Sequence, residues 1–264
     1  MSGFAWWLRD SWEMVLRNLI HIKRTPELLL DVTLSPIMFV ILFNFVFGGA
    51  IGRLVGAQGG DEENYINYMM SGIFVQTIAF AGIYTSVLLA NDLQKGMIDR
   101  FRSLPMAQSA VLTGRTLTDL LRALLAVAIM WIVGMLVGFR PEGGIVGNAA
   151  AIGLMLLFGF ALSWVGVAAG ALVRTPEALQ GIIFAVVFPL TFVSSAFVPT
   201  DTMPDWLRWF ADRQPMTLVM NEVRDLTLGI DVYEAELAAV LWCVGVLVVA
   251  FPLGLWLYNR RTTQ

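Results

Sequence analysis

The chain has 264 residues, of which 58% are hydrophobic and 14% are charged, and its mean hydropathy is +0.73. Soluble domains carry about 25% charged residues, so this composition excludes a water-soluble globule. One histidine and one cysteine exclude a disulfide framework and a metal cluster of histidines and cysteines. We therefore expect an all-α, polytopic membrane protein, and the length is typical of a single domain over residues 1–264.

The first segment, 1–27, is predicted to form an amphipathic helix at the membrane surface. Phe4, Leu8 and Trp12 share one side at helical spacing, whereas Arg9 and Glu13 share the other. Charges interrupt the apolar residues throughout, which is unlike the core of a secretory signal peptide. A soluble helix packed on a partner is the alternative, and both interpretations put the segment at the cytoplasmic face.

Six apolar runs of about 20 residues follow, the length that a helix needs to cross the hydrocarbon of a bilayer. They cover residues 28–49, 69–90, 120–139, 145–173, 179–198 and 238–258. With the N-terminus inside, only five of the 17 lysines and arginines lie outside, which is the positive-inside pattern. We expect a multi-pass protein of the cell (inner or plasma) membrane, with six transmembrane helices and both termini in the cytoplasm.

The cytoplasmic stretch 91–106 carries a hydrophobic stripe that a simple connection would not need. Leu93, Met97 and Phe101 recur every four residues among charged side chains, and Pro105 stops the pattern. This spacing predicts a short amphipathic helix that docks into a groove on another protein. A helix resting on the bilayer surface fits the composition equally well.

Residues for catalysis are missing from the sequence. It has no G-x-x-x-x-G-K-[ST] phosphate loop, so we do not expect the chain to hold ATP in that way by itself. His21 is the only histidine and falls on the predicted surface helix, and Cys243 lies among apolar residues of the last span. These observations predict a protein that is not an enzyme and has no cofactor or metal of its own.

Two motifs resemble one known family. The run Asp92-Leu-Gln-Lys-Gly-Met-Ile-Asp-Arg-Phe-Arg-Ser-Leu-Pro105, followed by Leu112-Thr-Gly-Arg115, is similar to the cytoplasmic coupling region of ABC-2 type exporter permeases. Residues 188–204 resemble the signature of that family around its fifth span, most closely in the actinobacterial permeases of daunorubicin and doxorubicin resistance.

The resemblance implies a coupling helix, 91–106, seated in a separate nucleotide-binding subunit that holds ATP and Mg²⁺. Its contact residues would be Asp92, Leu93, Lys95, Gly96, Met97, Asp99, Arg100, Phe101, Arg102 and Pro105. It also implies an extracellular gate segment, 199–236, with Trp206, Trp209 and Phe210 on short helices. The residues after Pro215 predict a second short helix, 216–228, that ends at Gly229. From the residues alone, those helices either re-enter the membrane or lie flat at its surface.

Polar residues within the second and fifth spans are candidates for the substrate pathway. They are Asn67, Gln76, Thr77, Tyr84, Thr191, Ser194 and Ser195. Such residues also hold helices together in lipid, so packing is the alternative interpretation of each.

Taken together, these features predict the permease half of an exporter for hydrophobic or amphipathic compounds such as antibiotics. Its partners would be two ATPase subunits, a second permease copy or homologue, membrane lipid and a small hydrophobic cargo, with no nucleic acid. Export of lipid or glycolipid is the alternative within this class. An ion-driven transporter would be expected to place ionisable residues deep in the membrane, and the spans lack them.

Overall fold

The computed structural model describes residues 34, 37–47, 62–94, 108–173, 175–230 and 236–262, and every regular element in these ranges is helical. Predicted features in the ranges 1–33, 48–61, 95–107 and 231–235, including the surface helix over 1–27, lie outside the described residues. The expected all-α architecture is confirmed for the described part of the chain.

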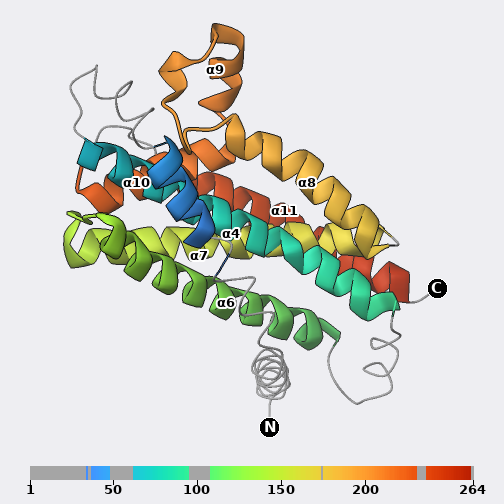
Figure 1. Cartoon of the computed structure of the whole chain (residues 1–264). Helices are drawn as coiled ribbons and strands as arrows, with labels where there is room; N and C mark the ends of the chain where they lie inside the picture. The colour runs from blue at the N-terminus through green and yellow to red at the C-terminus, as the bar shows by residue number, and fades with distance from the viewer. Residues whose placement is uncertain are drawn as a thin grey trace.

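Long helices form the body of the molecule and run alongside one another in Figure 1. They are α4 (Glu62–Gln94), α6 (Gln108–Val137), α7 (Gly144–Leu172), α8 (Pro176–Phe192) and α11 (Glu236–Thr262). The shorter elements are the π-helix η1 (Phe43–Phe47), the 3-10 helix η2 (Thr200–Thr202), α9 (Asp205–Ala211) and α10 (Pro215–Leu228). In Figure 1, α10 lies at one end of the bundle and α9 projects beside it.

Helix α4 is the centre of the bundle and packs against α6, α7, α8 and α10. It is apolar on all sides, which suits a helix surrounded by others. Phe74 of α4 stacks on Trp131 of α6 with 5.2 Å between ring centroids, and Phe139 meets both rings edge-on. The core of the described chain therefore forms around the second predicted span.

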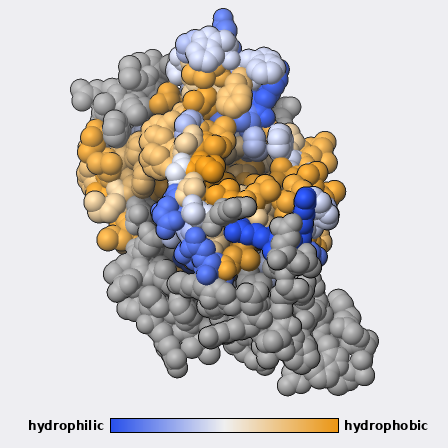
Figure 2. All heavy atoms as spheres, turned by 90° about the vertical axis from the view of Figure 1, so that its right-hand side faces the viewer, coloured by the Kyte–Doolittle hydropathy of each residue, from blue (hydrophilic) through white to orange (hydrophobic). Residues whose placement is uncertain are grey.

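The outer surfaces of the other long helices are apolar, as lipid requires. Leu136 of α6 is 82% exposed and Val248 of α11 is 66% exposed. Figure 2 shows apolar residues on both flanks of the described part, with hydrophilic residues gathered between them and at the top. A soluble monomer would not leave such a large apolar surface uncovered, so lipid is the natural surrounding of this bundle.

Four of the predicted spans are confirmed by helices that are long and apolar enough to cross a membrane: α4, α6, α7 and α11. The fifth is present as α8, whose 17 residues rise about 26 Å, somewhat short of a typical span. Of the first predicted span, residues 34 and 37–47 are described, and 37–42 are helical and continue into η1. The number six therefore stays a prediction.

Helix α8 ends six residues before the predicted boundary at Val198, and local hydrogen bonds explain why. Pro189 has no amide hydrogen to donate within the helix. The Ser194 hydroxyl donates to the Thr191 carbonyl and accepts a 3.1 Å hydrogen bond from the Ala196 amide. These bonds replace the helical pattern, so the chain turns although its sequence remains apolar.

An arginine near the end of α11 fastens the neighbouring helix α7. Nη1 of Arg261 donates to the carbonyl oxygens of Gly170, Ala171 and Val173, at 2.8, 3.2 and 2.7 Å. The last carbonyls of a helix have no partner within the helix, and a cation near them interacts favourably with the negative end of the helix dipole. Arg261 thereby joins the ends of α7 and α11.

Candidate functional site

The predicted coupling residues lie where the bundle leads into the interval 95–107. Asp92 and Leu93 occupy the last turn of α4 and are partly exposed. The other predicted contacts, Lys95, Gly96, Met97, Asp99, Arg100, Phe101, Arg102 and Pro105, lie outside the described residues. Because α4 ends at Gln94 and α6 begins at Gln108, these two helices carry the two ends of the coupling segment.

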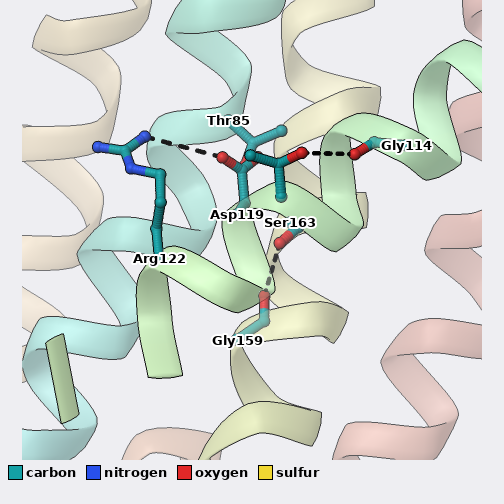
Figure 3. A network of polar contacts seen from close by, with 7 residues as sticks. Thr85, Gly114, Asp119, Arg122, Gly159 and Ser163 are labelled. Carbon is teal, nitrogen blue, oxygen red and sulfur yellow. Dashed lines mark hydrogen bonds and ion pairs between the residues drawn. The ribbon is translucent and has the colours of Figure 1, made fainter. Parts of the chain in front are cut away.

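A buried polar contact joins those two helices (Figure 3). Oγ1 of Thr85 on α4 donates a 2.7 Å hydrogen bond to Oδ2 of Asp119 on α6, which is only 8% exposed. Nη1 of Arg122, one turn along α6, lies 3.8 Å from Oδ1 of Asp119. The arginine and the hydroxyl together compensate the carboxylate, which would be costly to bury alone.

The three hydroxyl residues predicted near the end of the fifth span come together, but they face α10. The Thr191 hydroxyl donates 2.8 Å to the Val187 carbonyl and lies 3.8 Å from the sulfur of Met216. The Ser194 hydroxyl lies 3.4 Å from the sulfur of Met220. All three side chains are at most 2% exposed, so in this structure they serve the contact between α8 and α10.

Ser195 belongs to a polar cluster that sequence reasoning missed, centred on Arg224 of α10. Nη2 of Arg224 donates to the carbonyls of Ser195 and Tyr68, at 2.9 and 3.2 Å, and Nη1 donates 2.8 Å to Oδ1 of Asn221. The Ser195 hydroxyl donates 2.6 Å to the same amide oxygen. Arg224 is 1% exposed and holds α4, α10 and the turn after α8 together. The only sequence signal for this cluster was the presence of a charged residue, Arg224, within the predicted short helix 216–228.

The remaining pathway candidates lie along α4 and have different surroundings. Oδ1 of Asn67 accepts a 2.8 Å hydrogen bond from the amide of Arg140, in the turn between α6 and α7. Gln76 is 4% exposed and Thr77 is partly buried in the middle of the helix. Tyr84 packs against the small buried cluster that includes Leu179 of α8. The structure therefore spreads these four residues along the helix.

The predicted gate residues share the short helix α9 and are largely exposed. Trp206, Trp209 and Phe210 are 75%, 62% and 43% exposed. The second predicted helix of this segment, 216–228, is confirmed as α10, and Gly229 ends it in the left-handed region at φ 66°. Helix α10 packs against α4, α7 and α11, so it lies within the bundle, whereas α9 stands apart.

Taken together, the fold defines a class: a multi-pass helical membrane protein with buried polar contacts between its helices. Residues 10–228 match the ABC-2 type transporter family model. The chain is 34% identical to the daunorubicin resistance ABC transporter permease protein DrrB1 of Streptomyces coeruleorubidus, over 94% of this chain and 85% of that protein.

Two further relatives are more distant. The doxorubicin resistance ABC transporter permease protein DrrB of Mycobacterium tuberculosis is 26% identical over 83% of this chain and 75% of that protein. ABC transporter G family member 20 of Dictyostelium discoideum is 26% identical over 73% of this chain, which corresponds to 27% of that longer protein. The chain belongs to the ABC-2 type transporter family, as its coupling-region and fifth-span motifs predicted.

Proposed function

We propose that this protein is the permease subunit of an ATP-driven exporter that moves hydrophobic or amphipathic compounds, antibiotics among them, out of the cytoplasm or the inner leaflet. The observation that carries the proposal is the match to the family over residues 10–228, on a helix bundle with an apolar outer surface. The relatives named for daunorubicin and doxorubicin resistance support the cargo class.

The energy comes from a separate nucleotide-binding subunit, which holds ATP and Mg²⁺. That subunit docks on 91–106 at the cytoplasmic face, and the sequence of this chain lacks a phosphate loop. Helices α4 and α6 carry the two ends of the docking segment. A displacement of that segment therefore reaches both helices, which the hydrogen bond between Thr85 and Asp119 also connects directly.

Two permease chains, identical or homologous, enclose the cargo pathway. Thr191 and Ser194 now contact Met216 and Met220, so cargo reaches these hydroxyls only when α10 moves away from the end of α8. Gln76 and Thr77 of α4 extend the polar lining, and the exposed rings of Trp206 and Trp209 on α9 meet the cargo at the exit. Methionine side chains suit such a surface because they repack easily.

The test is the ATPase activity of the complex, co-purified with its nucleotide-binding subunit and reconstituted in lipid vesicles. Daunorubicin and doxorubicin should raise ATP turnover and be moved across the vesicle membrane. A complex whose ATPase subunit lacks its phosphate-loop lysine is the control and should do neither. If the drugs leave turnover unchanged while lipids or glycolipids raise it, the alternative cargo is correct. If the permease alone hydrolyses ATP, the assignment of ATP hydrolysis to a separate subunit is wrong.

A further inference from the structure

An open apolar groove of about 990 Å³ runs along α11, beside α7. Its floor and walls include Val165, Ala168, Leu241, Trp242 and Val249. It extends from Ala238 to Leu253, a rise of about 22 Å at 1.5 Å per residue. One leaflet of a bilayer contributes about 15 Å of hydrocarbon, so the groove is long enough for an acyl chain of that leaflet.

A second cavity, of about 460 Å³, adjoins the groove at the end nearest α9. The two cavities share Asp212, Leu218 and Ala238 in their linings. Apart from these, most of the residues that line the second cavity are polar or charged, including Asn221, Asp201 and Arg208. The groove therefore opens at one end into a polar cleft, and the combined space is amphipathic along its length.

The junction offers charges of both signs. Nε of Arg208 lies 3.5 Å from Oδ2 of Asp212, and both side chains are partly exposed. Arg213 stands 4.9 Å from the centroid of the Trp209 ring, and Asp201 adds an exposed carboxylate to the cleft. Guanidinium groups bind phosphate and carboxylates bind an ammonium group. A zwitterionic headgroup satisfies both, and an exposed tryptophan suits the headgroup layer.

We propose that the groove and the cleft together bind a single phospholipid with a phosphoethanolamine headgroup, drawn from the leaflet at the α9 end. One acyl chain lies along α11 and the other stays in the surrounding lipid at the open side of the groove. The phosphate lies between Arg208 and Arg213, and the ammonium group faces Asp201 and Asp212. The exposed side chains of Leu241 and Val249 leave the groove open to lipid along its side. This inference does not depend on the cargo or on the proposed function.

Gly245 allows a direct test, because it lines the groove and a Cβ built on it meets no atom within 4 Å. Gly245→Leu therefore fills the groove without straining α11. Gly153→Leu on α7 is the matched control, since a Cβ there also meets nothing within 4 Å and the residue is outside the groove lining. Val249→Phe fills the groove from a second position, should Gly245→Leu fail to fold.

The full-length chain is purified in mild detergent, offered equal amounts of dioleoyl phosphatidylethanolamine and dioleoyl phosphatidylglycerol, and its retained lipids are counted by native mass spectrometry. Wild type and Gly153→Leu should each keep one phosphatidylethanolamine. Gly245→Leu and Val249→Phe should lower its retention about tenfold. Asp201→Asn should reduce the preference for phosphatidylethanolamine over phosphatidylglycerol.

Three results would overturn the proposal. Equal retention by Gly245→Leu and wild type would show that the lipid binds elsewhere. Equal retention of the two phospholipids by wild type would contradict the assigned headgroup. A wild-type chain that keeps neither phospholipid would contradict lipid binding in the groove.

Discussion

The guanidinium carbon of Arg224 lies 3.5 Å from the centre of the Tyr68 ring, so a buried cation of α10 rests directly on an aromatic residue of α4. The same guanidinium donates hydrogen bonds to backbone carbonyls of Tyr68 and Ser195. A guanidinium group can stack on an aromatic ring and donate several hydrogen bonds at the same time. Lysine and apolar residues cannot do both in this geometry. This contact, with the hydrogen bonds, gives the buried guanidinium of α10 partners on α4 and in the turn after α8.

Arg224→Met should destabilise the protein strongly, because it removes the guanidinium donor from the carbonyls of Tyr68 and Ser195 and one of the two donors from the Asn221 amide oxygen. The expected cost is about 3 kcal/mol, or about 5–10 °C in the thermal midpoint of the purified chain. Arg224→Lys should lose most of this as well. Arg208→Met is the control, because that arginine is exposed and its ion pair among the described residues is with Asp212 in the next turn. Equal midpoints for Arg224→Met and Arg208→Met would contradict this account.

Thr85→Val should destabilise the protein modestly, because it keeps the shape of the side chain and removes the 2.7 Å hydrogen bond to Asp119. Hydrogen bonds between membrane helices contribute about 1 kcal/mol, so the thermal midpoint should fall by about 2–4 °C. In an Asp119→Ala background the same change should have little further effect. Thr77→Val, on the same helix, is the control. Additive effects of the Thr85 and Asp119 changes would show that the two residues act independently.

Gly170→Ala should disrupt the packing of α7 on α4. A Cβ at Gly170 would lie 2.7 Å from the carbonyl oxygen of Ser86, which is too close. Because this neighbour is backbone, it cannot relieve the clash by changing rotamer, and the helices must move apart. Gly153→Ala, on the same helix, meets open space and should be neutral or stabilising by about 0.5–1 kcal/mol, since alanine favours the helix. The yield of monodisperse protein and the thermal midpoint measure both variants. A wild-type midpoint for Gly170→Ala would mean that the helices are less closely packed.

Local signals explain what the sequence predicted well. Hydrophobic runs indicated α4, α6, α7 and α11, because the length of a span is set by the bilayer and not by distant contacts. The end of α10 was predicted correctly at Gly229, since its positive φ is a local property of glycine. The predicted end of the fifth span was wrong, because hydrogen bonds around Ser194, and not hydrophobicity, end α8.

The buried polar contacts between helices were harder to predict, because the two residues of each contact are far apart in the sequence. Tyr68 and Arg224 are separated by 156 positions, and no spacing rule connects them. The stretch 216–228 was predicted as a short helix, but the burial of Arg224 with Glu222 and Asp225 depends on tertiary packing. The hydroxyls of Thr191 and Ser194 were recognised as candidates, but their contacts with methionines of α10 depend on tertiary packing alone.

The last prediction concerns the coupling segment, where Leu93 lies in the last turn of α4 and Met97 and Phe101 follow it in the sequence at intervals of four residues. Replacing all three by alanine should separate ATP hydrolysis from export while leaving membrane insertion intact. Apolar anchors at the centre of an interface contribute about 2 kcal/mol each, whereas an exposed ion pair contributes at most about 1 kcal/mol. The triple variant should therefore lose the ATPase subunit during co-purification and lose drug export in vesicles. Charge reversal by Arg102→Glu is the control and should impair both much less. Normal export by the triple variant, or a larger defect in the Arg102 variant, would show that the apolar stripe is not the docking surface.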